Sequence, residues 1–278
     1  MRLADRPRSG HDVGPEVGMA SSLATRIGLV AGVSIATLAR GWGMSARAAF
    51  RRARRAGSAP ASGMGALNSS PGDDIRGWIL RPSDRSSLTP ALFLDRDGVI
   101  VEEVGHLGRS ESVQLIPGAS AAIARANGLG VPVVVITNQA GIGKGLYQWS
   151  GFESVNREMI RQLADEGAWL DAIFACPFHP DAFPPYQATD HFGRKPEPGM
   201  LLQAGRDLDL DLRASWIVGD TLSDIVAGRR ARLEGAVLVL TGHGTRHREE
   251  AIAQSDEQYP VLVAPTLGVA AAMIPFLT

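Results

Sequence analysis

Asp95 and Asp97, two acidic residues separated by one position, are the residues of this sequence best suited to chemistry. They follow the apolar run 91–94, and Gly98 comes next, where the backbone can turn sharply. Neighbouring carboxylates repel each other, and a divalent cation such as Mg²⁺ relieves that repulsion. One carboxylate of such a pair can act as nucleophile and metal ligand while the other transfers a proton. A plain surface turn rich in Asp and Gly is the alternative interpretation.

More polar residues occur close to later apolar runs. Thr137 and Asn138 follow the run 131–136, Asp220 and Asp224 follow another run, and Lys195 lies just ahead of a predicted helix. A lysine and neutral donors can bind phosphate oxygens, and carboxylates can bind a metal or take part in covalent transfer, so the set suits a phosphoryl group with Mg²⁺. Taken singly, each could be a turn, a helix cap or a solvated corner.

The elements that must position these residues begin at residue 88. We expect strands at 91–94, 131–136, 171–175, 215–218, 236–240 and 261–263, and helices at 117–127, 150–166, 198–208, 222–233 and 267–274. Apolar strands separated by helices indicate an α/β fold with a doubly wound parallel sheet covered on both faces. In such a sheet the ligands bind outside the carboxyl ends of the strands. No large insertion separates the first two strands, so we expect no large cap domain, and the irregular loop 177–194 is expected to shape the pocket.

The motifs in this order resemble those of the haloacid dehalogenase (HAD) superfamily of aspartate-nucleophile phosphotransferases. The segment 93–98 resembles its first motif, Thr137 its second, Lys195 its third, and Gly219-Asp220 with Asp224 its fourth. The longer segments 94–100, 137–145, 194–200 and 218–224 together resemble the D-glycero-D-manno-heptose 1,7-bisphosphate 7-phosphatases. The related histidinol-phosphate phosphatases share much of this pattern. The resemblance covers about residues 88–278 and implies a HAD-like, Rossmann-type fold.

The same resemblance implies roles for individual residues. Asp95 would be the nucleophile and Asp97 the acid/base. Mg²⁺ would be bound by Asp95, the backbone carbonyl of Asp97, and Asp220. Asp224 would steady Lys195 or a metal-bound water. The residues implied to contact phosphate or the rest of the substrate are Thr137 and Lys195, then Glu103 to His106, Asn138, Gln139, Arg194 and Thr221.

One departure from the family concerns zinc. Many members carry a loop of the form Cys-x-His followed by Cys-x-Cys directly before Arg-Lys-Pro. Here the matching positions are Cys176 and Phe178, then His191 and Gly193, so two of four ligands are missing. A closed structural zinc site wants four ligands, so we expect no zinc. His179 is one residue out of register, which leaves a site made with Cys176 and His191 as the alternative.

The segment 140–145, Ala-Gly-Ile-Gly-Lys-Gly, is similar to a phosphate-binding P-loop but does not match it. That loop needs a glycine where Asn138 stands and a Ser or Thr at Gly145. A P-loop kinase is therefore a poor interpretation. We expect Lys144 to contact an anionic substrate from a flexible glycine loop.

Composition limits the remaining possibilities. The chain has 278 residues with a net charge of -1, yet residues 1–60 carry ten arginines and three acidic residues. We interpret residues 1–85 as an Ala/Arg-rich extension that is disordered or spuriously translated, with Met64 a plausible true start. A short amphipathic helix on a partner or membrane surface and a targeting peptide are the alternatives for this segment.

These observations also predict the partners of the chain and its compartment. Cys176 is the only cysteine, so no intramolecular disulfide can form, and a reducing, cytoplasmic location fits. The apolar run 27–39 is too short for a confident membrane span. Basic charge without interleaved aromatic residues is a weak signal for nucleic acid. We therefore expect a monomer that binds a small-molecule sugar phosphate, with no nucleic acid and no stable membrane insertion.

We accordingly expect a Mg²⁺-dependent phosphomonoesterase that works through an aspartyl-phosphate. The resemblance favours removal of the 7-phosphate of D-glycero-D-manno-heptose 1,7-bisphosphate. Histidinol phosphate or another small sugar phosphate is the alternative substrate. The alternative from another class is a non-catalytic phosphate-binding scaffold on the same fold, in which loss of Asp95 or Asp97 would be expected; both are present.

Overall fold

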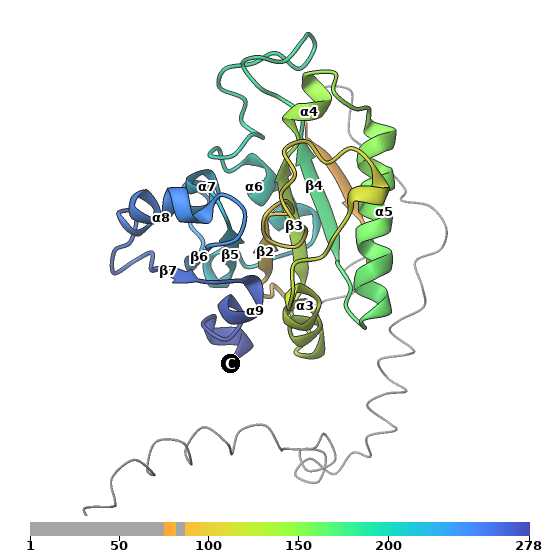
Figure 1. The fold of residues 1–278 in the computed structure, drawn as a ribbon. Coiled ribbons are helices and arrows are strands. Elements are labelled where there is room, and N and C mark those ends of the chain that lie inside the picture. Colours follow the sequence, from red (N-terminus) through yellow and green to blue (C-terminus); the bar gives the residue numbers. More distant parts are fainter. Residues whose placement is uncertain (1–74, 82–86) are drawn as a thin grey trace, which may run out of the picture. The chain divides into compact units, whose positions relative to one another are not determined.

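A computed structural model of the chain describes residues 75–81 and 87–278 (Figure 1). Of the predicted extension over residues 1–85, residues 1–74 and 82–85 lie outside the described residues. The described part forms a seven-stranded sheet in the order β1-β4-β3-β2-β5-β6-β7. All neighbouring strands are parallel except the edge pair β1 and β4, which is antiparallel. The strands are β1 (Arg76–Ile79), β2 (Leu92–Leu94), β3 (Val133–Asn138), β4 (Ala172–Cys176), β5 (Trp216–Gly219), β6 (Gly235–Val239) and β7 (Val261–Ala264).

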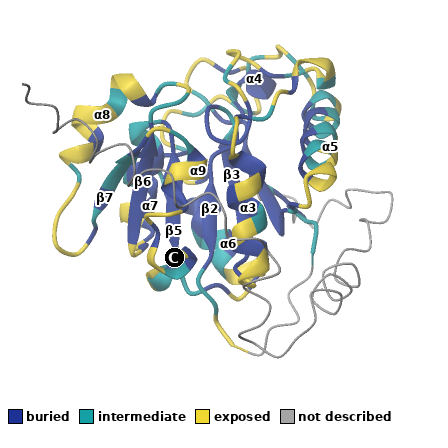
Figure 2. Cartoon of the chain, turned by 60° about the horizontal axis from the view of Figure 1, so that its bottom comes forward, coloured by how far each residue is buried: buried dark blue, intermediate teal, exposed yellow. Residues whose placement is uncertain are grey.

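Helices cover both faces of the sheet, as Figure 2 shows by the burial of the strands between them. Alternate strand residues pack on opposite sides because successive side chains of a strand point to opposite faces. Leu92 and Leu94 contribute to one core cluster and Phe93 to the other. The first cluster includes side chains of α3 (Ala119–Gly128), α5 (Trp149–Asp165) and α9 (Leu267–Ala270), and the second includes those of α6 (Gly199–Asp207), α7 (Leu222–Arg230) and α8 (Gly244–Ile252). The predicted doubly wound α/β fold is confirmed.

Helix α5 shows how sequence spacing produces this packing. Its buried apolar residues Phe152, Val155, Met159 and Leu163 recur at intervals of three and four, which places them on one face of the helix. The helix begins at Trp149 after an N-cap at Gln148 and ends at Asp165, so it is displaced by one residue from the predicted range 150–166. Trp149 is the first residue of the helix, and its ring packs against that of Phe152, with centroids 5.6 Å apart.

Strand β1 lies in the segment that we assigned to the N-terminal extension. It pairs with β4, Arg76 opposite Ala175, and adds an antiparallel edge strand to the parallel sheet. Its Trp78 is 1% exposed and packs against Trp149 and Phe152 at centroid distances of 5.7 and 5.1 Å. The sheet therefore begins before residue 88. A four-residue strand with one large apolar residue gives too weak a periodic signal to be seen in the sequence.

The segments between strands are short helices and loops. Between β2 and β3 lie the 3-10 helix η1 (Ser110–Ser112) and α3, and after β3 come the helical turn α4 (Ala140–Gly143) and α5. Two further 3-10 helices are η2 (Leu212–Ala214) and η3 (Pro275–Leu277). Across residues 75–81 and 87–278, none of the helices has the length and apolar character needed to cross a bilayer.

Candidate active site

A cavity of about 270 Å³ lies at the carboxyl ends of the central strands. Asp95 and Asp97 reach it from the end of β2, Thr137 from β3, and Asp220 from the end of β5. The parallel arrangement brings these strand ends to one edge of the sheet, as the sequence predicted. The predicted site residues that line the cavity are Asp95, Asp97, Glu103, His106, Thr137, Asn138, Gln139, Arg194, Lys195, Asp220 and Thr221.

Asp95 is buried in the floor of the site and receives two donors on one oxygen. Its Oδ1 accepts the backbone N–H of Arg96 at 2.7 Å and lies 3.0 Å from Lys195 Nζ. Burial raises the pKa of Asp95 to about 7; Lys195 opposes this shift, and the charges of Asp224 and Asp97 add to it. Since the charged form is disfavoured, a cation at this place would restore the carboxylate.

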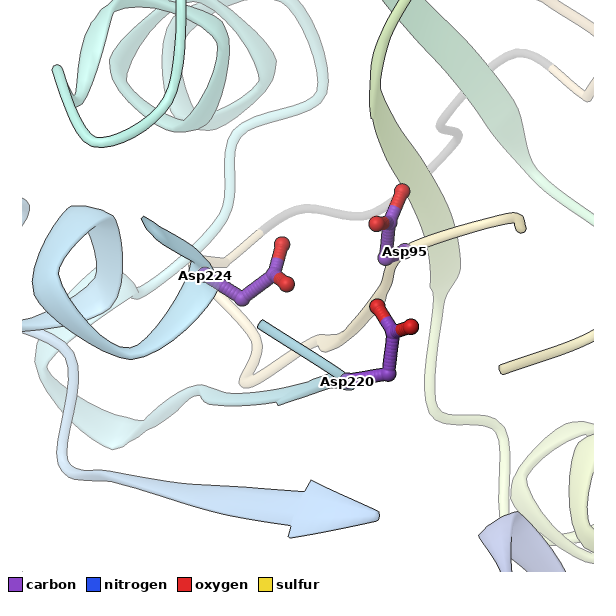
Figure 3. Close-up of side chains that lie close together, drawn as sticks. All are labelled: Asp95, Asp220 and Asp224. Atoms are coloured by element: carbon purple, nitrogen blue, oxygen red, sulfur yellow. The ribbon is translucent and has the colours of Figure 1, made fainter. Parts of the chain in front are cut away.

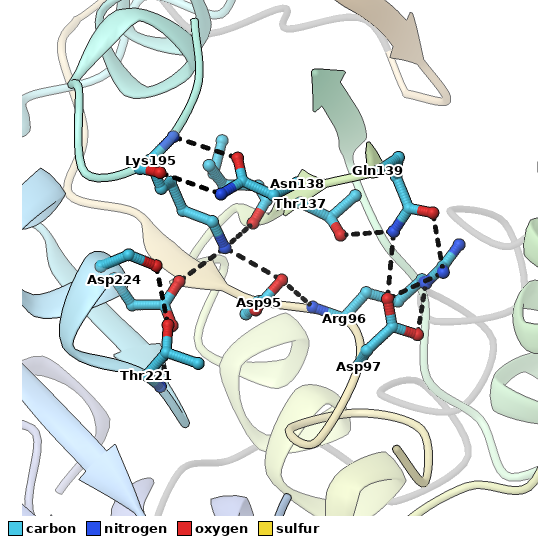
Figure 4. Close-up of polar contacts among 11 residues, drawn as sticks. Asp95, Arg96, Asp97, Thr137, Asn138, Gln139, Lys195, Thr221 and Asp224 are labelled. Carbon is cyan, nitrogen blue, oxygen red and sulfur yellow. Dashed lines mark hydrogen bonds and ion pairs between the residues drawn. The ribbon is translucent and has the colours of Figure 1, made fainter. Parts of the chain in front are cut away.

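Lys195 is almost fully buried between two acids (Figure 4). Its Nζ donates to Asp224 Oδ1 at 2.5 Å and to the carbonyl of Ile136 at 2.8 Å. Burial alone would lower the pKa of Lys195, but Asp224 and Asp95 outweigh it and hold that pKa above its ordinary value. The ammonium is therefore a fixed positive charge beside Asp95.

The amide of Asn138 fixes the backbone of Lys195. Its Oδ1 accepts the Lys195 N–H and its Nδ2 donates to the Lys195 carbonyl, both at 3.0 Å. The sequence predicted Asn138 as a substrate contact. In the structure this side chain lines the cavity and also anchors the turn that carries the lysine.

Asp224 uses both of its carboxylate oxygens within the protein. Oδ1 pairs with Lys195, and Oδ2 accepts the Thr221 N–H at 3.1 Å and the Thr221 hydroxyl at 2.6 Å. The bond from the Thr221 N–H to Oδ2 is one half of a capping box at the start of α7, and the Asp224 N–H donating to the Thr221 side chain is the other half. The predicted role of Asp224 in steadying Lys195 fits this geometry, and its hydroxyl partner Thr221 serves as the helix cap.

Two glycines enclose Asp220. Gly98 and Gly242 have φ angles of +77° and +55°, and a Cβ on either would collide with Asp220 Oδ2. The same oxygen accepts the backbone N–H of His243 at 2.8 Å. Burial raises the pKa of Asp220 to about 8, with further contributions from the charges of Asp95 and Asp224.

The carboxylates of Asp95, Asp220 and Asp224 face one another (Figure 3). One oxygen from each lies within 4.8 Å of the others, and over the described ranges this is the only group of three potential metal ligands. Hard carboxylate oxygens and raised pKa values suit a divalent cation. Because both oxygens of Asp224 already have partners, Asp95 and Asp220 are the side chains that fit as ligands.

Cys176, His179 and His191, the three residues considered as zinc ligands, do not form a comparable group of potential metal ligands. Cys176 Sγ lies 3.6 Å from His191 Nδ1, whose ring stacks on Phe178 at 3.7 Å. His179 Nδ1 instead accepts the backbone N–H of Asp181 at 3.0 Å. Stacking and hydrogen bonds therefore organise this loop, and the expectation about zinc stays a prediction.

Asp97 belongs to a second hydrogen-bonded group beside the three carboxylates of Asp95, Asp220 and Asp224. Arg96 donates to both of its oxygens, Nε to Oδ1 at 3.1 Å and a terminal nitrogen to Oδ2 at 2.8 Å. Gln139 Nε2 donates to Asp97 Oδ2 at 3.0 Å and to the hydroxyl of Thr137 at 2.8 Å. Tyr147 in turn donates to Gln139 Oε1.

Lys144 is a predicted substrate contact that does not line the cavity. The segment predicted as a flexible glycine loop is the helical turn α4, in which Gly141 packs against Tyr147 and Gly143 against the carbonyl of Pro177. Lys144 Nζ lies 3.9 Å from Asp181. Small residues were needed here for close packing, so glycine content did not mean flexibility.

Several residues of the site were missed by sequence reasoning. Arg96, which binds Asp97 from behind the cavity, was passed over between the two acids, and so were Tyr147, Ser223 and His243, which line the cavity. Tyr147 packs between Gly108 and Gly141, where a Cβ on either glycine would strike its ring, and nothing in the sequence pattern signals this contact. His243 gives no such signal because its contact to Asp220 is made by the backbone.

Comparison with known proteins agrees with this geometry. Residues 192–270 match a family model described as HAD-hydrolase-like. The chain is 47% identical over 164 residues to the D-glycero-beta-D-manno-heptose-1,7-bisphosphate 7-phosphatase of Mesorhizobium japonicum, covering 58% of this chain and 76% of the relative. The enzyme of the same name from Escherichia coli K12 is 39% identical over 158 residues, 55% of this chain and 80% of the relative.

Solved structures give the same grouping. A protein from Mesorhizobium loti described as a HAD-like phosphatase superposes with a TM-score of 0.65 at 35% identity, covering 76% of this chain and 96% of that one. The D,D-heptose 1,7-bisphosphate phosphatase of B. bronchiseptica, complexed with magnesium and phosphate, gives 0.57 at 32% identity, covering 66% and 97%. This chain therefore belongs to the HAD-like hydrolases and, within them, to a family of phosphatases, which are phosphoric monoester hydrolases.

Proposed function

We propose that this phosphatase requires Mg²⁺ and removes the 7-phosphate of D-glycero-D-manno-heptose 1,7-bisphosphate through an aspartyl-phosphate. The observation that carries the proposal is the placement of Asp95 between Lys195 and Asp220 in a small cavity. The names of the relatives and the magnesium and phosphate in the B. bronchiseptica complex support the substrate and the metal.

The proposed chemistry has two steps. Asp95 attacks phosphorus, the bond from phosphorus to the sugar oxygen breaks, and Asp97 donates a proton to the departing oxygen. Asp97 then takes a proton from water, which attacks the aspartyl-phosphate and releases inorganic phosphate. Asp95 Oδ1 accepts from Lys195 and from the Arg96 N–H, which leaves Oδ2 for the attack or for the metal.

The surrounding residues supply charge compensation. Lys195 and the hydroxyl of Thr137 would bind the oxygens of the reacting phosphoryl group. Asp95, the backbone carbonyl of Asp97, and Asp220 would hold Mg²⁺, which would neutralise charge that develops on the phosphoryl oxygens. Asp224 would keep Lys195 charged and oriented.

A second phosphate on the substrate needs positive charge outside this centre. Arg194 lines the cavity, and its guanidinium donates to the carbonyl of Phe178 at 3.0 Å, which fixes it on the 177–194 loop. Burial lowers the pKa of His179 on the 177–194 loop, and the nearby charges of Arg194 and Lys144 lower it further. His106 and Glu103 line the cavity and would contact the sugar. We assign the second phosphate to Arg194.

The test is a phosphate-release assay of the full chain with Mg²⁺ over a set of small phosphate esters. The set contains both anomers of heptose 1,7-bisphosphate, histidinol phosphate and simple hexose phosphates. We expect the highest kcat/KM for a heptose bisphosphate. Equal efficiency on all esters, or a preference for histidinol phosphate, would contradict the substrate assignment and leave the phosphatase family intact.

A further inference from the structure

Arg96 is a fully buried cation that binds the side chain of its neighbour Asp97. Its exposed fraction is 0%, and it binds both oxygens of Asp97 at 3.1 and 2.8 Å. A guanidinium is a rigid planar fork, so two parallel bonds to one carboxylate fix the direction of that carboxylate as well as its distance. Asp97 itself retains 20% exposure of its side chain and lines the cavity. Arg96 therefore holds Asp97 from the protein side while the cavity side stays accessible.

Gln139 is the second residue that holds the Asp97 side chain, and its amide has no hydrogen-bonding group left for a ligand. Its Nε2 donates to Asp97 at 3.0 Å and to Thr137 at 2.8 Å. Its Oε1 accepts from Arg96 at 3.2 Å and from Tyr147. A primary amide offers two donors and two acceptor sites, so all four are used within the protein. The side chain is also 2% exposed, which makes a direct bond to substrate implausible on geometry alone.

Burial of the Arg96 guanidinium in this arrangement costs stability. One terminal nitrogen of Arg96 is buried without a hydrogen-bond partner, and its guanidinium carbon lies 5.3 Å from the centre of the Phe152 ring. A cation over an aromatic ring recovers part of the lost hydration but leaves an unpaired buried donor. Apolar residues of similar volume often replace buried ion pairs without loss of stability. Stability alone therefore gives no reason for an arginine at this position.

We propose that Arg96 and Gln139 are positioning residues that fix the Asp97 carboxylate for proton transfer and hold it in register with Thr137. Because Gln139 binds Asp97 and Thr137 at once, the proton-transfer group and the hydroxyl beside the phosphoryl group cannot move independently. The inference rests on the proposed acid/base role of Asp97. It replaces the expectation that Gln139 contacts substrate.

The choice of leaving group on the substrate distinguishes a positioning role of Arg96 and Gln139 from a general role in supporting the fold. When the bond from phosphorus to a sugar oxygen breaks, the electron pair stays on an alkoxide, which needs a proton from Asp97. A p-nitrophenolate leaving group is stable as an anion and needs no proton in that step. Loss of Asp97 alignment should therefore slow cleavage of an alkyl phosphate much more than cleavage of p-nitrophenyl phosphate. Damage to the fold would slow both.

The experiment measures the first turnover of heptose 1,7-bisphosphate and of p-nitrophenyl phosphate by rapid quench with Mg²⁺ present. The variants are Gln139→Leu, Arg96→Met, Arg96→Lys and Asp97→Asn. We expect Gln139→Leu and Arg96→Met to lose at least tenfold more rate on the sugar phosphate than on the aryl ester, in the same direction as Asp97→Asn, since proton transfer contributes roughly 10²–10⁴-fold. KM should change little, and Arg96→Lys should recover part of the loss.

Two exposed replacements of the same kinds, Gln258→Leu and Arg157→Met, serve as controls and should show no split between substrates. Equal losses on both substrates for Gln139→Leu would overturn the inference, and Gln139→Leu decides if Arg96→Met fails to fold. If Asp97→Asn shows the split and the positioning variants do not, only this inference falls. If Asp97→Asn shows no split, the acid/base role and the inference fall together.

Discussion

Gly242 lies directly against the carboxylate of Asp220, so close that a Cβ at this position would collide with Oδ2. The neighbouring N–H of His243 binds the same oxygen at 2.8 Å. The loop after β6 therefore determines where Asp220 points. The proposed metal ligand Asp220 is fixed by backbone in this way, which leaves no room for a side chain on Gly242.

We predict that Gly242→Ala weakens Mg²⁺ binding by at least about tenfold, because mutation of a group that orients a metal ligand typically costs 10- to 100-fold in metal affinity. The matched control is Gly167→Ala. Gly167 also has a positive φ, +80°, but its Cβ would meet nothing within 4 Å. Both variants carry the strain of alanine in a left-handed conformation, so any difference in Mg²⁺ titration reports the clash with Asp220. Equal affinities in the two variants would rule out Asp220 as a ligand fixed by Gly242.

The stability of the metal-free protein should fall as pH rises from about 4 to about 8. Burial raises the pKa of Asp95 to about 7 and that of Asp220 to about 8, both from 3.8. Over this window the folded state binds more protons than the unfolded state, so the free energy of unfolding decreases with pH. Mg²⁺ compensates the ionised pair, so its stabilising effect should grow over the same range.

The measurement is the melting temperature with and without Mg²⁺ at pH 5 and pH 8. We expect a clearly larger Mg²⁺-induced rise at pH 8. In Asp220→Asn the difference between the two pH values should shrink, because one of the two titrating carboxylates is gone. A rise that is the same at both pH values would mean that these two acids do not hold the cation.

Arg194 should carry substrate discrimination. A charge-assisted contact to a phosphate contributes on the order of 1.5–3 kcal/mol, or about ten- to a hundredfold in affinity. Arg194→Ala should therefore lower kcat/KM for heptose 1,7-bisphosphate by that factor, and lower it less for a small ester with one phosphate, because remote binding energy discriminates between substrates. The control is Arg230→Ala, whose side chain pairs with Glu197 outside the cavity. A uniform loss over all esters would place the second phosphate elsewhere.

Strand β1 separates two ways of shortening the chain. A chain that begins at Met64 keeps β1, and we expect it to retain its melting temperature and activity. A chain that begins at Leu88 loses Trp78, whose fully buried ring packs on Phe152 beneath Arg96. Truncation of a buried tryptophan alone costs about 3–5 kcal/mol, so this shorter chain should melt at a clearly lower temperature. A loss already present on starting at Met64 would show that residues before 64 support the domain.

Sequence patterns predicted which residues meet at the cavity because most of these residues lie at strand ends. Asp95, Asp220 and Lys195 each lie next to an apolar run or a helix start, and a parallel sheet brings such positions to one edge. The same logic missed two elements, because β1 is too short and α8 too polar to show periodicity. Only Gly244 and Ala251 of α8 are buried.

The remaining differences come from contacts that no local pattern records. Arg96 interacts with Gln139, 43 positions away, and Tyr147 fits between glycines on separate segments. Lys144 was predicted at the cavity from its glycine-rich neighbourhood, yet those glycines serve the packing of α4. Residue type and spacing identified the groups that are proposed to react, whereas the groups proposed to orient them depend on tertiary contacts.

The most direct test of the central claim is ³¹P NMR of heptose 1,7-bisphosphate incubated with the full chain and Mg²⁺, run in parallel with Asp95→Asn. We predict that the signal of the primary 7-phosphate gives way to inorganic phosphate while the 1-phosphate signal persists. In Asp95→Asn both signals should remain, because the attacking carboxylate is gone. Loss of the 1-phosphate, or release by a folded Asp95→Asn protein at a rate near that of the unaltered chain, would contradict the account.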